Sequence, residues 1–258
     1  MKIYVLVKEV PDTYGDRKLD LETGLADRGA GDVVLDEITE RALEVALSYA
    51  DKNTGTEVIA LSMSPESATA SIRRALAMGA ASAVHVADDA LRGADLALTA
   101  ETLAAAIRRG EPDLVITGNL STDGSGGVIP AMLAEQLGYA QATALSALEI
   151  TADQVTGTRA GDEGTQQVTA TLPAVVSITE ALPDARFPNF KGIMAAKKKP
   201  LEVLSLADLG VSADPAEAPH TIMTAVSEKP PRAAGIKITD EGDAVSQLVE
   251  FLAQNRLV

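Results

Sequence analysis

The chain contains no cysteine and no tryptophan among its 258 residues, and only 3% of its residues are aromatic. Without cysteine it can form no disulfide, no thiolate metal site and no thiol nucleophile. The two histidines, His85 and His220, lie far apart in the sequence, so we exclude a histidine-rich site and predict no metal. With so few aromatic residues the core must consist of Val, Ile, Leu and Ala, which suits a parallel sheet covered by helices.

Positive charge is also scarce. The 37 acidic and 22 basic residues give a net charge of −15. Such a chain repels nucleic acid and anionic membrane surfaces, so we expect neither as a partner. No stretch approaches the ~20 apolar residues of a membrane span, and the opening run MKIYVLVKEV is too short for a signal peptide. The expected location is the cytoplasm.

Strand and helix patterns alternate along the first half of the chain. A β-branched, apolar run at 3–7 predicts a buried first strand. Further strands are expected at 58–61, 82–86 and 114–117, and helices at 36–49, 65–78, 94–109 and 128–137. Residues 12–34 are polar and contain glycine, which indicates a long loop or a small hairpin pairing 18–20 with 24–26. The alternation predicts a doubly wound, mostly parallel, Rossmann-like α/β sheet of the kind that binds adenine nucleotides.

The pattern changes after Tyr139. Alternating runs at 148–155 and 166–171 predict an antiparallel addition to the sheet edge, followed by strands at 174–178 and 201–206. From Gly210 onward Pro and Ala dominate, with prolines at 215, 219, 230 and 231, and the chain ends in an amphipathic helix at 243–254. We therefore expect an α/β nucleotide-binding domain at 1–209 and a C-terminal arm and helix at 210–258.

A glycine-rich turn, GNLSTDGSGGVIP at 118–130, falls between a predicted strand and a predicted helix. Its glycines allow a close approach of the backbone to a ligand, and the N–H groups that open the helix suit a phosphate. A tight turn that only connects strand and helix is an equally good interpretation of the pattern. Because no Lys or Arg lies within the turn to stabilise a transferring phosphate, we expect nucleotide binding without cleavage.

The segment 180–199, EALPDARFPNFKGIMAAKKK, carries two of the three Phe residues and a basic tract on an acidic chain. We interpret it as an exposed element that docks another protein. The lysines at 197–199 could instead be a solvated helix end. His85, inside the apolar run SAVHV, is expected to be a core residue, and the pair Asp162 and Glu163 is expected in a turn rather than as an acid–base pair.

The chain resembles the beta subunit of electron-transfer flavoprotein over essentially its whole length. The most specific match is the run GTRAGDEGTQQVTATLPAVV at 157–176, which is similar to the family signature. Independent support comes from four further runs in the expected order: VLVKEVPDT, IRRALAMGA, TDGSGG and RFPNFKGIMAAKKK.

The resemblance implies a heterodimer in which the alpha subunit holds most of the FAD and the beta subunit buries a structural AMP. It implies an electron carrier without its own catalytic residues, which passes electrons from flavin dehydrogenases, such as acyl-CoA dehydrogenases of fatty acid β-oxidation, toward a quinone reductase. The implied AMP contacts are Leu6, Asp36, Met63, Asp123, Ser125, Gly126, Gly127, Val128 and Ile129. Those implied near the FAD are Thr13, Tyr14 and Ile38. Those implied for docking are Arg186, Phe187, Phe190, Ile193, Met194, Lys197, Lys198 and Lys199.

Several positions depart from the family pattern, among them Ser177 and the run GVI at 127–129, where many relatives carry Gln with a small hydroxyl residue. Asp36 stands where relatives often have Asn, and Phe190 stands at the apolar anchor that is usually Leu. Thr13 occupies the place of an aromatic residue expected near the flavin, with Tyr14 one place beyond it. Ala160 falls where some relatives have a Glu that reaches the alpha subunit.

Two alternatives keep the glycine-rich turn. The first is a bifurcating flavoprotein, in which a second FAD replaces AMP. The second is an ATP-binding stress-type protein on a similar fold, which would turn over or exchange ATP but would leave the signature run and the basic segment without a role.

Overall fold

The computed structural model describes residues 1–15, 17–214, 216, 221–232 and 234–258. Pro215, Pro219 and His220, which entered the sequence predictions for the arm and for a metal site, lie outside the described residues. The chain divides into two compact units, Met1–Thr224 and Ala225–Val258.

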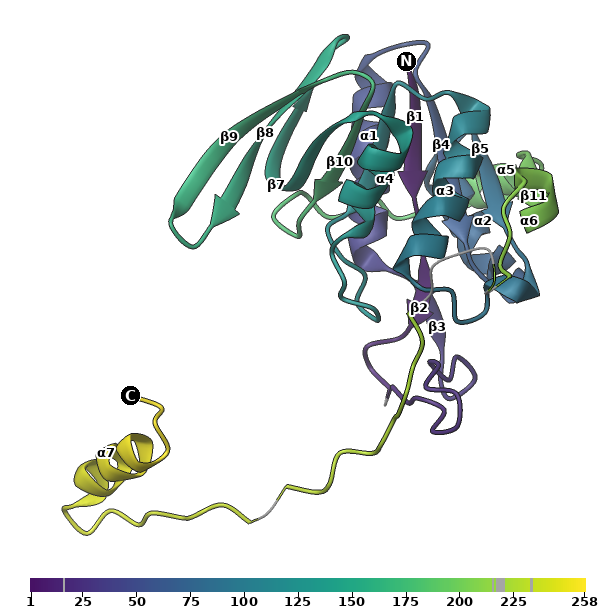
Figure 1. Cartoon of the computed structure of the whole chain (residues 1–258). Coiled ribbons are helices and arrows are strands. Elements are labelled where there is room, and N and C mark those ends of the chain that lie inside the picture. Colours follow the sequence, from purple (N-terminus) through teal and green to yellow (C-terminus); the bar gives the residue numbers. More distant parts are fainter. Residues whose placement is uncertain (16, 215, 217–220, 233) are drawn as a thin grey trace. The chain divides into compact units, whose positions relative to one another are not determined.

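One sheet organises the first unit (Figure 1). Its strands follow the order β11-β5-β4-β1-β6-β10-β7-β8-β9 within the described residues. Their bounds are β1 Lys2–Leu6, β4 Glu57–Met63, β5 Ser82–Val86, β6 Leu114–Gly118, β7 Ala140–Ile150, β8 Gln154–Gly161, β9 Gly164–Thr171, β10 Ala174–Ile178 and β11 Leu201–Leu204. The strands from β11 to β7 pair in parallel, whereas β8 and β9 add an antiparallel edge. A separate small sheet pairs β2 (Glu9–Pro11) with β3 (Val33–Leu35).

Helices cover both faces of the parallel part, which confirms the predicted doubly wound α/β fold. One core cluster joins α1 and α2 to the sheet, and a second joins α3 and α4 to its other face. The helix bounds are α1 Glu37–Lys52, α2 Thr69–Met78, α3 Leu96–Gly110, α4 Ile129–Leu137, α5 Phe190–Ala196, α6 Leu206–Leu209 and α7 Ala244–Gln254, with 3-10 turns η1 at Glu66–Ala68 and η2 at Asp89–Leu91.

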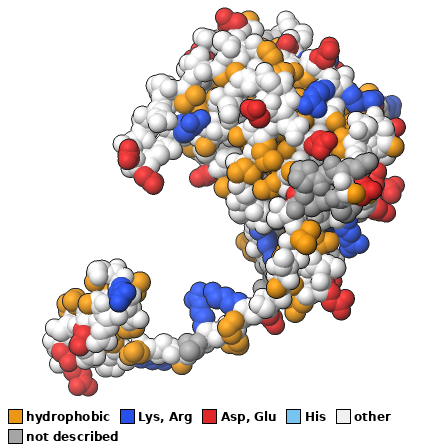
Figure 2. Space-filling model, in the orientation of Figure 1, with side chains coloured by type: hydrophobic (Ala, Val, Ile, Leu, Met, Phe, Trp, Pro, Cys, Tyr) orange, Lys and Arg blue, Asp and Glu red, His pale blue; other side chains and the backbone are white. Residues whose placement is uncertain are grey.

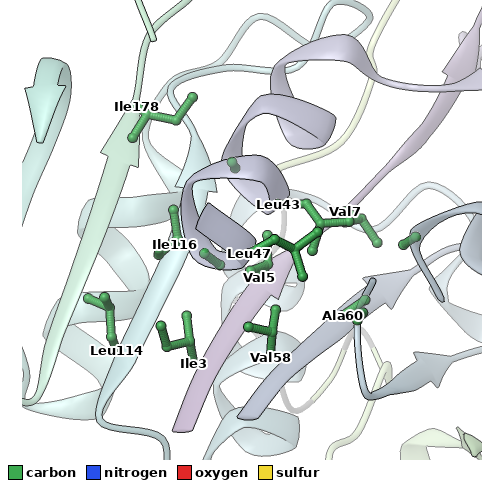
Figure 3. Close-up of a cluster of buried hydrophobic side chains, with 14 of the residues drawn as sticks. Ile3, Val5, Val7, Leu43, Leu47, Val58, Ala60, Leu114, Ile116 and Ile178 are labelled. Atoms are coloured by element: carbon green, nitrogen blue, oxygen red, sulfur yellow. The ribbon is translucent and has the colours of Figure 1, made fainter. Parts of the chain in front are cut away.

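The core is aliphatic, as the composition predicts. In Figure 3, Leu43 and Leu47 of α1 point toward Val5 and Val7, at the central strand. Alternation along β1 sends Val5 to this face and Tyr4 to the other, where it joins the second cluster. Because β1 is covered on both faces, its position in the sheet is fixed, and so is the loop that follows it.

The order of the strands reverses at β1. The chain runs from β1 to β4 and β5 on one side, and then crosses to β6 on the other side. Ligands of open α/β sheets bind outside the carboxyl ends of the strands at such a reversal. Here the carboxyl ends of β1 and β6 are neighbours, because Val5 pairs with Ile116.

Two predicted strands need correction. The strand predicted at 148–155 is wrong, because a turn at 151–153 separates β7 from β8. The strand predicted at 201–206 ends at Leu204, since the hydroxyl of Ser205 accepts from the N–H of Asp208 and begins α6. The antiparallel edge itself is confirmed, as is the small hairpin, in which Leu19 pairs with Ala26.

The second unit contains α7, which confirms the predicted terminal helix. Its apolar residues Val245, Leu248 and Val249 are exposed, and none of its described residues is buried. Among the helices of the described residues, none combines the length and the apolar character that crossing a membrane requires.

Candidate nucleotide-binding turn and docking loop

The glycine-rich turn lies at the carboxyl end of β6 and leads into α4. The N–H of Ser125 donates to the carbonyl of Ser121 at 2.9 Å, which closes the turn. Ser125 and Gly127 adopt positive φ angles of 50° and 66°, a backbone shape that glycine adopts without the penalty that other residues carry. The turn is therefore shaped by its backbone rather than by a hydrophobic side chain.

This shape leaves hydrogen-bond donors free. Within the described part of the chain, the N–H groups of Gly126, Gly127 and Val128 have no hydrogen-bond partner. Pro130 follows in the first turn of α4, where its missing N–H is not needed. Free N–H groups at a helix N-terminus, together with the positive end of the helix dipole, favour an anion. The local structure thus fits the phosphate of a nucleotide.

Asp36 joins the start of α1 to this turn. Its carboxylate Oδ2 accepts the N–H of Thr122 at 2.9 Å, and the residue is only 1% exposed. No described residue provides a hydrogen bond to Oδ1. Burial raises the pKa of Asp36 above its ordinary value. The structure therefore brings Asp36 and the turn together, as the resemblance implied, and leaves one buried polar oxygen for another partner.

Three cations from outside the turn contact it, and the sequence analysis missed all of them. The Nζ of Lys8 lies 2.7 Å from Oδ1 of Asp123 and 3.2 Å from Oγ of Ser121. The Arg28 guanidinium lies 3.5 Å from Oδ2 of Asp123. Arg17 donates to the carbonyl oxygen of Thr122 and, at 3.2 Å, to its Oγ1.

Asp123 is held by these cations. Burial acts to raise the pKa of its carboxyl, but the hydrogen bond and the charge of Lys8 outweigh it and hold the pKa below its ordinary value. Asp123 is therefore ionised, and it pairs with two of the three cations, Lys8 and Arg28. The sequence shows only that Lys8 follows the first predicted strand; that β6, which ends at the turn, is the neighbour of this strand is known from the structure.

The other residues implied for cofactors lie near the same edge of the sheet. Leu6 ends β1 and Met63 ends β4, both partly buried. Ile38 is buried beneath the end of β6, where a Cβ at Gly118 would lie 2.8 Å from its side chain. Thr13 and Tyr14 lie in the loop after β2, with the Tyr14 side chain fully exposed. Among the described residues, no hydrogen bond or ion pair joins Thr13 or Tyr14 to the turn.

The docking loop, residues 180–199, folds against α1 and α2. The side chain of Asn189 caps α5 by accepting the N–H of Gly192 at 2.8 Å. Gly192 lies against α2 so closely that a Cβ there would collide with the carbonyl oxygen of Ala77. Arg73 of α2 donates to the carbonyl of Ala196 at 2.7 Å, at the end of α5. The loop is thus a shaped element of the fold.

Arg186 has partners within the chain. Its guanidinium binds both carboxylate oxygens of Glu44 at 2.7 and 2.9 Å and Oδ2 of Asp51 at 2.9 Å, both on α1. Burial acts to raise the pKa of Glu44, but hydrogen bonds from Arg186 and Ser48 hold it below its ordinary value. Arg186 therefore fixes the start of the docking loop to α1.

Lys199 fixes the end of the docking loop. Its Nζ donates to the carbonyls of Leu76 and Ala80, at 2.8 and 2.6 Å, at the C-terminal end of α2. Burial lowers the pKa of Lys199. Lys197 and Lys198 are exposed. The basic tract thus divides into one lysine with a structural role and two that face solvent.

Between these two attachments the loop exposes apolar side chains. Phe187 is 86% exposed and Phe190 is 78% exposed, and Ile193 and Met194 are about half exposed. We call these four residues the apolar tip. Exposed aromatic and aliphatic side chains that cluster on a fixed backbone are typical of protein-binding sites.

Comparison with known proteins shows the family of the chain. The model of the electron transfer flavoprotein domain matches residues 23–209. An electron transfer flavoprotein subunit beta of Mycobacterium tuberculosis is 47% identical over 264 residues, with 99% of each chain covered. The chain belongs to the electron transfer flavoprotein beta subunit family.

More distant members match as well. The electron transfer flavoprotein subunit beta of Syntrophomonas wolfei is 34% identical over 98% of this chain and 96% of its own length. The subunit CarD of a caffeyl-CoA reductase–Etf complex from Acetobacterium woodii is 34% identical over 82% of this chain and 81% of its own. The predicted family is therefore confirmed, and the stress-type protein is not the family to which this chain belongs.

The run that carried the resemblance, 157–176, forms most of the antiparallel edge and the start of β10. Asp162 and Glu163 lie in the turn between β8 and β9, as predicted, and acidic side chains mark the tip of this hairpin in Figure 2. His85 is fully buried, as predicted, with its Nε2 3.0 Å from the carbonyl oxygen of Ser64.

Proposed function

We propose that this electron transfer flavoprotein beta subunit binds a structural AMP at the turn 118–130. It encloses part of an FAD held mainly by an alpha subunit. It docks flavin dehydrogenases, such as acyl-CoA dehydrogenases, through the apolar tip, and electrons pass from there toward a quinone reductase. The chain supplies no catalytic residues of its own. The cytoplasmic location stays a prediction from the sequence.

The observation that carries the AMP assignment is the set of free N–H groups at Gly126, Gly127 and Val128. They lie where the strand order reverses, at the position of ligands in open α/β sheets. The buried Oδ1 of Asp36, without a partner among the described residues, adds a polar atom that a nucleotide could satisfy. A buried acceptor that lacks a hydrogen bond is costly, so a ligand that donates one would be favoured.

The docking assignment is supported by the different roles of the residues within 180–199: some attach the loop to the fold, and others are exposed. Arg186 and Lys199 bind α1 and α2, so ordering the loop costs little when a partner arrives. Phe190, the anchor in the resemblance, is then free to enter an apolar pocket on the partner, a contact of about 2 kcal/mol. A contact of this size gives specificity and still allows release.

The arm and helix at 210–258 form the second part of the proposal: they pack on the alpha subunit. The supporting observation is the exposed apolar face of α7, with Val245, Leu248 and Val249. An isolated amphipathic helix gains most of its stability by burying such a face. The alpha subunit is the partner that the resemblance provides for it.

The identity of the bound nucleotide tests the proposal most simply. We would denature the co-expressed dimer and identify the released nucleotides by chromatography. The proposal expects one AMP and one FAD per dimer. Two FAD and no AMP would instead select the bifurcating alternative, in keeping with the relative that belongs to a caffeyl-CoA reductase–Etf complex.

Docking is tested separately with Phe190→Ala. We expect slower reduction of the flavin by the dehydrogenase, by roughly 30-fold for a lost contact of about 2 kcal/mol, with unchanged FAD content. Gln136→Ala is the control, because it truncates an exposed side chain near the end of α4, outside the residues assigned to docking. An unchanged reduction rate in Phe190→Ala would refute the docking assignment.

A further inference from the structure

The cations beside the turn carry more positive charge than the turn neutralises. Lys8, Arg17 and Arg28 reach it from the segments after β1 and between β2 and β3. Asp123 is the carboxylate that contacts them within the described residues. Two positive charges therefore remain without a carboxylate, on a chain whose net charge is −15.

Arg17 shows this surplus most clearly. Its guanidinium bonds only to neutral oxygens in the described structure: the carbonyl and Oγ1 of Thr122, and the carbonyl of Pro11 at 3.1 Å. Asp36 also faces Thr122, but its carboxylate accepts a backbone N–H instead of contacting a cation. Arg17 thus lies across the turn and the loop without an ion pair among the described residues, although Asp12, Asp27 and Asp32 line the same hollow.

We propose that Lys8, Arg17 and Arg28 bind the phosphate of the nucleotide, and that Asp123 holds Lys8 and Arg28 in place before the nucleotide arrives. This inference rests on the proposed function of the turn. A phosphate monoester carries about −1.5 to −2 charges at neutral pH, which matches the surplus beside the turn. The free N–H groups of Gly126, Gly127 and Val128 provide further donors.

A purely structural role for the three cations is the competing interpretation. In that case they only tie the loop between β2 and β3 to the turn. Their loss would then loosen the whole site, and it would weaken the binding of adenosine as much as that of AMP. Phosphate binding predicts a loss for AMP alone, because adenosine has no phosphate.

The experiment compares AMP and adenosine on the nucleotide-free heterodimer by titration calorimetry, in the wild type and in Lys8→Gln, Arg17→Gln and Arg28→Gln. We expect each substitution to weaken AMP binding by roughly 10-fold or more, since a hydrogen bond between charged groups is lost, and to leave adenosine binding unchanged. Added salt should weaken AMP binding less in the variants than in the wild type.

Lys52→Gln is the matched control, because it removes the same charge at the far end of α1, about 24 Å along the helix from Asp36. We expect AMP affinity to change there by less than about 2-fold. FAD content and the melting temperature of each dimer verify assembly. Asp123→Asn gives a second measurement: Lys8 and Arg28 lose the carboxylate that positions them, so AMP should bind several-fold more weakly and adenosine binding should not change.

The inference is overturned if the three variants bind AMP like the wild type, if AMP and adenosine affinities fall together, or if Asp123→Asn binds AMP as tightly as the wild type does. A wild-type dimer that binds neither AMP nor adenosine would instead remove the proposed nucleotide site itself. The two failures are therefore distinguishable.

Discussion

The turn after β6 and the docking loop use their polar groups in opposite ways. In the turn the backbone is bent at Ser125 and Gly127, and the N–H groups of 126–128 have no partner among the described residues. In the docking loop, Asn189, Arg186 and Lys199 direct their polar atoms to the fold. What remains available differs accordingly: hydrogen-bond donors and cations at the turn, aromatic rings at the loop.

The comparison explains how one small chain can serve two kinds of partner. Free donors and cations favour an anion. Water solvates such an anion well, and the N–H groups at a helix N-terminus can take the place of that water. Free apolar side chains favour another protein surface, because contact removes them from water. Both elements are attached to α1, through Asp36 at one end and through Glu44 and Asp51 farther along.

The largest effect is expected from a substitution that displaces the docking loop and leaves the turn unchanged. In Gly192→Ala the new Cβ collides with the carbonyl oxygen of Ala77, so α5 must move away from α2. We expect flavin reduction by the dehydrogenase to slow by about 30-fold or more, because the apolar tip loses its position and each ring contributes about 2 kcal/mol. Stopped-flow reduction measures this rate, and chromatography measures the AMP content, which should not change.

Gly161→Ala is the control, since a Cβ there meets only ordinary contact distances and its φ is not positive. Normal reduction by Gly192→Ala would mean that the packing of α5 on α2 does not position the apolar tip.

A smaller effect is expected from Arg186→Gln. This substitution leaves the carboxylate of Glu44, whose side chain is 14% exposed, without its charged partner. We expect a loss of about 1–3 kcal/mol in the free energy of unfolding. Thermal melting of the dimer measures the loss. Asp184→Asn provides the comparison: Asp184 pairs with Arg41, but its side chain is 86% exposed, so its loss should cost less than about 1 kcal/mol. Equal shifts in the two variants would contradict the assigned role of Arg186.

The smallest effect depends on pH. The pKa of Glu44 lies below its ordinary value of 4.5 in the folded chain, so the stability that its ion pair adds is complete above pH 4.5. That stability is lost as the pH falls through the lowered pKa, while Arg186 stays charged. Melting curves of the wild type and Glu44→Gln should therefore differ at pH 7 and converge below pH 4.5. A difference that persists unchanged into acid would exclude the ion pair as its source.

The sequence predicted those parts of the fold whose signals are local. The β-branched runs at 82–86 and 174–178 are strands with the predicted bounds, and the glycine-rich turn lies between a strand and a helix. The first part of β7 was missed because Ala140–Ser146 is rich in Ala, Ser and Thr, without the branched apolar residues that indicate a strand.

Contacts between distant segments could not be predicted in the same way. Lys8 reaches Asp123 across 115 residues because β1 and β6 are neighbours in the sheet, a fact that no local pattern contains. Arg186 and Glu44 form an ion pair although 142 residues separate them. From the sequence alone, Arg186 could be predicted only as a docking residue, because it lies near two Phe residues. The residues of the candidate site could be proposed from the resemblance, but their intramolecular partners required the structure.

The central claim is that the turn holds the nucleotide and the docking loop holds the dehydrogenase, each without the other. One crossed measurement tests it: AMP content and the rate of flavin reduction, determined on the same preparations of Gly127→Val and of the double variant Phe187→Ala with Phe190→Ala. The account predicts that Gly127→Val loses AMP and keeps its reduction rate, while the double variant keeps AMP and loses the rate. The claim would be contradicted if AMP content and the reduction rate fell together in either variant, or if neither of them changed in both variants.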